Sequence, residues 1–127
     1  MGFDLALQTA IFSQLSGNIS CEVYDSPPKL PVYPYVIIGD DSFIPFDTDS
    51  TVGRDLIASI HIWDNYAGKK RIKQISGEIQ ALINRASFPV VGFHLINCVF
   101  DSSDYFLDAD GKTYHSILTF RLLLDEE

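Results

Sequence analysis

Cysteines and long apolar runs are scarce in this sequence. The chain has 127 residues and two cysteines, Cys21 and Cys98, which do not stand at the short paired spacing of metal sites. Both lie in apolar segments, so we interpret them as buried free thiols rather than as a disulfide or as metal ligands, which suits a reducing, cytosolic origin. No apolar run approaches the length needed to cross a bilayer, and we therefore expect no membrane partner.

Positive charge is also scarce. The chain has 9 Lys and Arg against 17 Asp and Glu, which gives a formal net charge of -8. Proteins that grip nucleic acid neutralise its phosphates with basic side chains, so this composition disfavours that class of protein. An acidic surface suits a protein along which DNA moves without being bound.

The motifs of common enzymes and metal sites are missing. The sequence has no Gly-x-Ser-x-Gly elbow, and His61, His94 and His115 lie on separate predicted strands without a ligand at diagnostic spacing. If two of these strands are adjacent, they could bring two histidines together as a catalytic or metal pair, but we favour structural histidines that are partly buried or at the surface. We expect no catalytic residue, no metal and no cofactor.

One acidic segment begins like a calcium-binding loop. Asp108-Ala109-Asp110-Gly111 has the opening letters of such a loop. However, Tyr114 and Leu118 stand where further oxygen ligands and the distal glutamate would be needed. We predict that the segment is the turn of a hairpin.

Two segments have the apolar periodicity of helices. Residues Phe3 to Leu15 place their apolar side chains on one side at helical spacing, and Gly17 is placed to end this helix. The second predicted helix, Lys70 to Ala86, is the clearer one and is expected to pack on a sheet. Its apolar stripe consists of Ile72, Ile75, Ile79, Leu82, Ile83 and Ala86.

Strand patterns account for much of the remaining chain. The predicted strands are residues 20–24, 35–39, 56–63, 89–100 and 114–123. Alternation along residues 56–63 directs side chains to two faces of a sheet, and both faces are predicted to be partly covered. The prolines of residues 27–34 impose an extended connector that can approach a sheet only at its edge. These elements fit a single domain over residues 1–127.

The one long irregular segment is predicted between Asp40 and Gly53. It contains Asp40, Asp41, Asp47 and Asp49 together with the apolar residues Phe43, Ile44 and Phe46. Long loops in compact domains are usually functional or mobile, and the apolar residues do not suit a plain linker. We interpret the segment as the tip of a long hairpin that acquires a partner, rather than as a flexible tip without a role. We interpret its aspartates as solvated rather than as a cation site.

A basic cluster opens the second predicted helix. It consists of Lys69, Lys70, Arg71 and Lys73, four of the 9 basic residues of the chain. Cations are unfavourable at the positive end of a helix dipole, by about 0.3–1 kcal/mol each. Two interpretations are open: a solvent-screened face, or an anchor for an acidic partner surface such as the acidic loop of a neighbouring copy.

Short motifs follow one another along nearly the whole chain. In order they are Val23-Tyr24-Asp25, Pro34-Tyr35-Val36-Ile37-Ile38-Gly39, His61-Ile62-Trp63, Gly68, Gly92-Phe93-His94-Leu95, Asp110-Gly111-Lys112-Thr113-Tyr114-His115 and Phe120-Arg121. Together with the apolar first helix, this ordered set resembles the tail-completion, or tail-terminator, proteins of long-tailed bacteriophages and of phage-like gene transfer agents. The apolar Phe43-Ile44-Pro45-Phe46 segment departs from the usual family pattern.

The resemblance implies both a fold and a function. The family fold is α+β, a mostly antiparallel β-sheet with two main helices packed against it, and the order of the predicted elements agrees. The implied function is that of a non-enzymatic virion protein which caps the head-proximal end of the tail tube as a ring, typically a hexamer. The ring ends tube polymerisation and forms part of the head–tail joint.

Several partners and contacts follow from this resemblance. The implied partners are further copies of the chain, the major tail tube protein and a head-completion or connector protein, while DNA passes through the lumen. The implied location is the tail of the virion, after assembly in the host cytoplasm. Candidates for axial or lumen contacts are Asp40, Asp41, Phe43, Ile44, Phe46, Asp47 and Asp49. Candidates for lateral contacts are Lys69, Lys70, Arg71 and Lys73, with the proline-rich edge of residues 27–34.

The rival function belongs to a different class. A small host α+β enzyme or ligand-binding domain would have its site in a pocket at the sheet edge, near His61 and Trp63.

Overall fold

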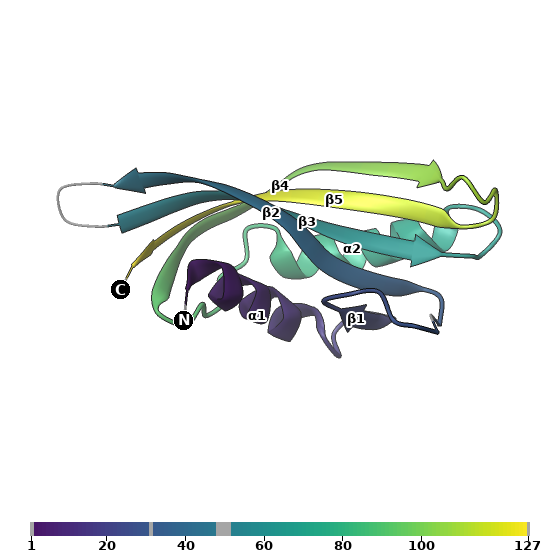
Figure 1. Cartoon of the computed structure of the whole chain (residues 1–127), viewed down its shortest axis with the longest axis horizontal. Helices are drawn as coiled ribbons and strands as arrows, with labels where there is room; N and C mark the ends of the chain where they lie inside the picture. Colours follow the sequence, from purple (N-terminus) through teal and green to yellow (C-terminus); the bar gives the residue numbers. More distant parts are fainter. Residues whose placement is uncertain (1, 31, 48–51, 127) are drawn as a thin grey trace.

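Two helices pack on one face of a five-stranded sheet (Figure 1). The computed structural model describes residues 2–30, 32–47 and 52–126, and for residues 40–47 and 52 it describes the backbone. The elements in chain order are α1 (Phe3–Leu15), β1 (Glu22–Tyr24), β2 (Tyr35–Asp47), β3 (Val52–Asp64), α2 (Lys70–Ile83), β4 (Phe93–Leu107) and β5 (Tyr114–Glu126). The strand order is β1-β2-β3-β5-β4. Only the β1–β2 pair among these strands is parallel, so the predicted α+β fold with a mostly antiparallel sheet is confirmed.

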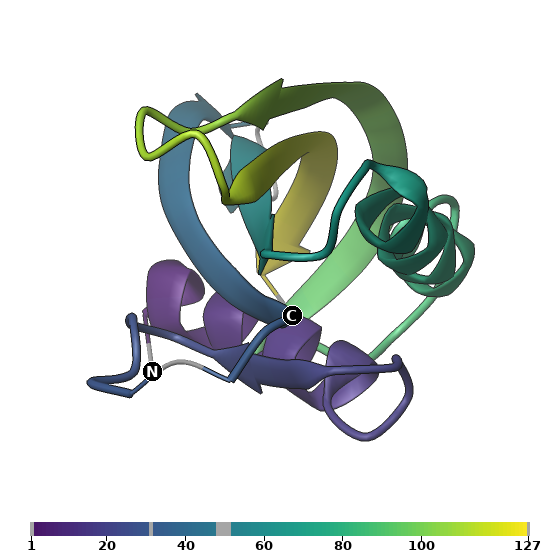
Figure 2. The ribbon, with the colours of Figure 1, turned by 90° about the vertical axis from the view of Figure 1, so that its right-hand side faces the viewer.

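The hydrophobic core lies between the sheet and the helices. Helix α1 packs against β1, β2 and α2, while α2 packs against β3, β4 and β5. Along β3 the helix-facing side chains of Leu56, Ala58, Ile60 and Ile62 are all buried, which confirms the predicted alternation. Viewed along the long axis, the strands turn around that axis, so the sheet is curled rather than flat (Figure 2). Neither of the two described helices is long and apolar enough to span a membrane.

The two helices follow the predicted apolar periodicity. Helix α1 has the predicted bounds, and Gly17 follows it with a φ of 79°, in the left-handed region that favours glycine. Helix α2 ends at Ile83, three residues before the predicted end. Its stripe is core as predicted, since Ile72, Ile75, Ile79 and Ile83 are buried and Leu82 and Ala86 are partly buried.

Helix α2 ends early because the next residues bind the edge of β4. The N–H of Arg85 donates to the carbonyl of Cys98 at 2.7 Å, and the N–H of Phe100 donates to Oδ1 of Asn84 at 2.8 Å. Arg85 has a φ of 56°, which is incompatible with continuing the helix. These bonds cover part of a strand edge that would otherwise offer free donors and acceptors.

The prediction of an irregular segment between Asp40 and Gly53 is wrong, although the predicted hairpin is present. Strand β2 continues to Asp47 instead of ending at Gly39, and β3 begins at Val52. The register shifts between Gly39 and Ser42, which interrupts the alternation that a strand prediction relies on. Pro45 fits because a proline is tolerated on a strand edge that needs no backbone donor. Residues 48–51 lie outside the described residues.

The other strands exist as predicted but with different bounds. Strand β4 begins at Phe93 rather than at residue 89, because Gly92 turns the chain with a φ of 85° and a bridge joins Val90 to Phe93. It extends to Leu107 through register shifts at Leu95/Asn97 and at Phe100/Ser102. Strand β5 extends to Glu126, and β1 is shorter than predicted. The predicted hairpin turn between β4 and β5 is confirmed.

Candidate functional site

The basic cluster lies at the first turn of α2. Lys69 occupies the N-cap position without a side-chain cap hydrogen bond, and the first turn contains no acidic residue. Lys69, Lys70 and Lys73 are exposed. Neither Lys69 nor Lys70 makes an ion pair with any residue that the structure describes. The helix dipole therefore disfavours charges that the fold itself does not neutralise.

Arg71 differs from the three lysines because it belongs to the fold. Its guanidinium donates from Nε to Oδ2 of Asp64 at 2.8 Å, and from Nη2 to Oδ1 of the same carboxylate. The side chain of Asp64 is completely buried at the end of β3. This two-bond pairing with Asp64 raises the pKa of Arg71 and supplies the cation that a buried carboxylate requires. The ring of Tyr66 lies 5.1 Å from the same guanidinium.

Lys73 has a partial role in packing. Its Nζ lies 5.6 Å from the centre of the Tyr105 ring, and the Tyr105 hydroxyl donates to Oγ of Ser76 at 2.8 Å. A cation above an aromatic face at this distance is attracted by about 0.5–1 kcal/mol at an exposed site. Lys69 and Lys70 are thus the members of the cluster that the described fold uses least.

The candidate axial residues lie along one hairpin. Asp40, Asp41, Phe43, Ile44, Phe46 and Asp47 belong to β2, where the backbone from Ser42 to Asp47 pairs with residues 52–57 of β3. Asp49 lies outside the described residues. In Figure 1 this hairpin extends beyond both helices at one end of the molecule. The fold therefore gathers the six described positions on one projecting segment, which we call the arm (residues 40–47 and 52–53).

At the other end of the sheet, aromatic rings form a row across four strands. Tyr35, Trp63, His115 and Phe106 are direct neighbours in register on β2, β3, β5 and β4. The rings of Trp63 and His115 are nearly parallel, and their centres are 4.1 Å apart. The ring centres of Tyr35 and Trp63 are 5.5 Å apart. Phe106 meets His115 edge-on at 4.8 Å. Since the rings cover one another's faces, the row is a packed layer.

His61 stacks on Trp63 and His115 of this row, so two of the three histidines meet here. Nδ1 of His61 lies 2.8 Å from Nε2 of His115, a distance at which one ring donates a hydrogen bond to the other. Burial, and then the neighbouring His61, lower the pKa of His115, against a smaller opposing effect of Asp108. Nδ1 of His115 is 3.8 Å from Asp108, and His94 is an exposed residue 3.2 Å from Asp125. The described residues include no group of three or more side chains suited to a metal, and the structural interpretation of the histidines fits their packing.

The acidic turn between β4 and β5 is satisfied by its own backbone. The hydroxyl of Thr113 donates to Oδ2 of Asp110 at 2.6 Å, and the N–H groups of Lys112 and Thr113 donate to Oδ1 at 2.8 Å. These donors hold the pKa of Asp110 at about 2. The carboxylate thus closes the turn, in line with the predicted hairpin. Both cysteines are free, as predicted, with Cys98 buried and Cys21 half-buried just before β1.

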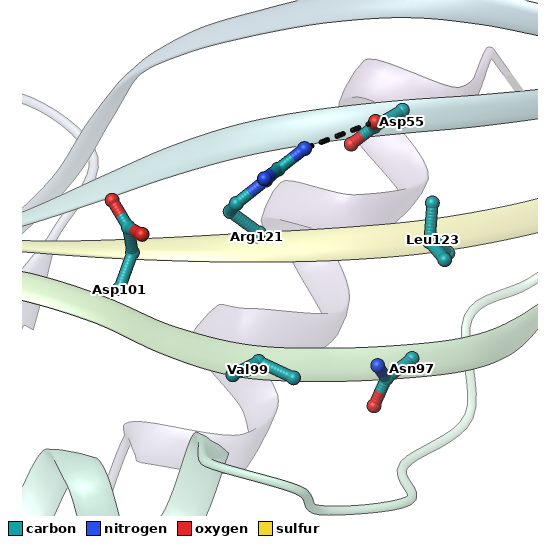
Figure 3. A pocket seen from close by; sticks show the side chains of 6 residues that line it. All are labelled: Asp55, Asn97, Val99, Asp101, Arg121 and Leu123. Atoms are coloured by element: carbon teal, nitrogen blue, oxygen red, sulfur yellow. Dashed lines mark hydrogen bonds and ion pairs between the residues drawn. The ribbon is translucent and has the colours of Figure 1, made fainter.

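A groove of about 440 Å³ lies on the sheet face opposite the helices (Figure 3). Its lining residues come from β3, β4 and β5 and are Asp55, Asn97, Val99, Asp101, Arg121 and Leu123. In Figure 3 their side chains stand in front of the strands, with the helices behind. Arg121 forms an exposed ion pair with Asp55, in which Nη2 and Oδ2 are 3.3 Å apart. Asp101 has no ion-pair partner among the described residues.

Sequence reasoning missed this groove. Alternation along β5 would have placed Arg121 on the same face as His115, but alternation fails on β4, where Asp101 lies within a register shift. The pairing of Arg121 with Val99 and of Leu123 with Asn97 becomes visible only when the strand order is known.

Comparisons with known proteins agree with the sequence pattern. The family model of the tail completion protein gp17 matches residues 6–125 of the chain. The tail completion protein gp17 of Bacillus phage SPP1 is 29% identical over 104 residues, which cover 82% of this chain and 77% of that protein.

A solved structure shares the fold. A chain from the virion of a native gene transfer agent particle superposes with a TM-score of 0.89, covering 98% of each chain at 17% sequence identity. At that identity the similarity shows the fold alone. The family match covers almost all of the described chain, so the resemblance inferred from the short motifs is confirmed: the chain belongs to the gp17 family of tail-completion proteins, structural proteins of the bacteriophage tail.

Proposed function

We propose that copies of this chain close into a ring, a hexamer, at the head-proximal end of the phage tail tube. The ring ends tube polymerisation and forms part of the head–tail joint. The match of residues 6–125 to the family of the tail completion protein gp17 carries this proposal, since a protein that completes the tail is expected to act at the tail's end. The partners are the major tail tube protein on one face and a head-completion or connector protein on the other, after assembly in the host cytoplasm.

A ring of identical copies requires one surface that binds a different surface of the next copy. Such a heterologous contact closes when its rotation divides a full turn, and otherwise it continues as a filament. For the lateral contact we propose the basic cluster, with Lys69, Lys70 and Lys73 exposed and Arg71 anchoring it to the fold. The proline-rich edge of residues 27–34 is the second lateral candidate, because Leu30 and Val32 are 89% and 73% exposed there.

For the axial or lumen contact we propose the arm. Its residues Asp40, Asp41, Phe43, Ile44, Phe46 and Asp47, together with Asp49, combine acidic and apolar side chains. An apolar sequence on a segment that extends past both helices gains burial from a partner (Figure 1). The acidic side chains and the net charge of -8 suit a lumen through which DNA passes without specific binding.

The proposal assigns no chemistry to the chain. We propose a single domain over residues 1–127 without catalytic, metal or cofactor sites. The rival function, an enzyme or ligand-binding domain near His61 and Trp63, gains no support from the ring stacking that fills this region.

The test combines purified chain with tubes of the major tail tube protein. We expect sedimentation and electron microscopy to show closed rings, and tubes that carry one ring and stop growing when the chain is added. A matched sample without the chain should continue to elongate. A chain that stays monomeric in the presence of tubes, and leaves their length distribution unchanged, would contradict the proposal.

A further inference from the structure

We propose that the groove on the sheet face opposite the helices receives the basic cluster of a second copy of the chain. The inference rests on the proposed ring and names the acceptor for its lateral contact. Its donor residues are Lys69 and Lys70, and its acceptor residues are Asp101 and Asp104.

The groove has the chemistry that a lysine side chain needs. Val99 and Leu123 provide apolar contacts for the aliphatic stem, and Asp101 provides a carboxylate for the ammonium group. Asp104 is exposed on the same strand and pairs in register with Ile117, which places it on the same face of the sheet. Because Asp55 already neutralises Arg121, the unpaired carboxylates set the sign of the local charge.

The basic cluster is complementary to this surface in charge and in position. Lys69 and Lys70 are exposed, and they have no ion-pair partner among the residues that the structure describes. They stand at the start of α2, on the helix side of the sheet, whereas the groove lies on the other side. One copy can therefore use both surfaces at once, as a head-to-tail ring requires. Two surfaces on the same face would instead favour a two-fold dimer.

If net charge alone controlled association, reversing the charge of the groove should strengthen the association between copies. Replacing Asp101 and Asp104 by lysine changes the net charge from -8 to -4, which reduces general repulsion between copies. If the groove binds a lysine of the next copy, the same change should still weaken association. The sign of the effect thus separates a specific contact from general electrostatics.

The experiment is a charge exchange in the full chain. We expect Lys69→Glu/Lys70→Glu and Asp101→Lys/Asp104→Lys each to weaken ring formation by about tenfold or more, because like charges then face each other. Combining all four substitutions in one chain restores opposite charges across the contact and restores the net charge of -8, so rings should form again. Mixing the two double variants should also restore assembly, since each supplies the surface that the other lacks.

Two control variants match the change in net charge. Arg85→Glu/Lys112→Glu lowers it to -12, as the lysine reversal does, and Glu22→Lys/Glu126→Lys raises it to -4, as the aspartate reversal does. All four control positions are exposed. Sedimentation velocity should give ring fractions close to wild type for both controls, and circular dichroism should confirm that every variant is folded.

The outcomes distinguish this inference from the proposed function. If the wild-type chain forms rings but the combined variant does not, or if Asp101→Lys/Asp104→Lys assembles as well as wild type, the groove is not the acceptor while the ring stands. If the wild-type chain forms no ring alone or with tail tubes, the proposed function fails and the inference fails with it. Loss in both double variants with recovery in the combined variant supports the contact.

Discussion

Removing Arg71 should strongly destabilise the fold, although the residue lies in a cluster of exposed lysines. Arg71→Ala leaves the carboxylate of Asp64 completely buried without its cation. Breaking a buried ion pair by removing one partner costs about 3–5 kcal/mol. Because 39% of the Arg71 side chain is exposed, water can reach the vacated position, so we expect the lower end, about 3 kcal/mol. That is a large fraction of the roughly 5–15 kcal/mol typical of a whole domain.

Two further variants isolate the charge interaction. In an Asp64→Asn background no buried charge remains, so adding Arg71→Ala should cost about 1 kcal/mol, the net value of an ordinary hydrogen bond. The difference between the two backgrounds gives the coupling energy of the pair. Lys70→Ala is the matched control, because it removes an exposed cation next to Arg71 and should change stability by no more than about 0.5 kcal/mol.

The measurement is equilibrium unfolding in urea, followed by the fluorescence of the single tryptophan, Trp63. It should be repeated at several protein concentrations, since assembly stabilises folded copies by mass action. If Arg71→Ala unfolds at the same urea concentration as Lys70→Ala, the pair with Asp64 is not a stabilising element. Arg71 would then belong with the lysines as a solvated residue.

Three other perturbations follow from the structure. Ile79→Asp should prevent soluble folding, since an unpaired charge in the core costs an amount on the order of the domain's total stability, whereas Gln74→Asp on the exposed side of α2 should express and melt like wild type. His115→Gln should flatten the pH dependence: the lowered pKa of His115 means that the unfolded chain binds its proton first, so wild-type stability falls as pH drops below 6.5. An equal fall in the variant would exclude His115 as the source. Asp110→Asn should lose stability relative to wild type at neutral pH, and the difference should shrink between pH 3.8 and about 2, where Asp110 of the folded wild type becomes protonated. Urea midpoints at pH 7, 5, 3.5 and about 2 would measure both effects.

Local patterns in the sequence predict much of this fold. Helix α1 has the predicted bounds, and the stripe of α2 is core, because helical spacing depends only on residues a few positions apart. The two faces of β3 follow from period-two alternation for the same reason. The family resemblance adds the arrangement of these elements, a mostly antiparallel sheet covered by two helices, and the structure confirms it.

Features that depend on pairing between strands are not predictable in the same way. The register shifts in β2 and β4 disrupt alternation, so the sequence predicts an irregular segment where the arm lies and ends the β4 strand at residue 100. Helix α2 ends early because Asn84 and Arg85 bind β4, through contacts between residues 13 and 16 positions apart. The separate role of Arg71 is hidden as well, since the sequence does not show that Asp64 is buried.

The sequence predicts the basic cluster of the candidate site but not the groove, for related reasons. The basic cluster is visible in the sequence because four cations are adjacent to a helix start. The groove is invisible because its residues come from three strands, and their neighbour relations depend on the order β3-β5-β4. The sequence allows several histidine pairs, and His61 contacts His115 because β3 and β5 are neighbouring strands.

Salt dependence links the acidity of the chain to its proposed assembly. Copies with a net charge of -8 repel one another over distances comparable to the Debye length, about 8 Å at physiological ionic strength. A lysine seated against Val99 and Leu123 is partly shielded from water, so its attraction to Asp101 is screened less than the general repulsion is. Moderate salt should therefore strengthen assembly of the wild-type chain, whereas contacts held only by exposed ion pairs would weaken. The four-residue charge exchange keeps the net charge at -8 and should respond to salt as wild type does. A steady loss of wild-type rings between about 0.02 M and about 0.15 M salt would instead mean that the lysines meet their partners in open solvent, without the apolar contacts of the groove.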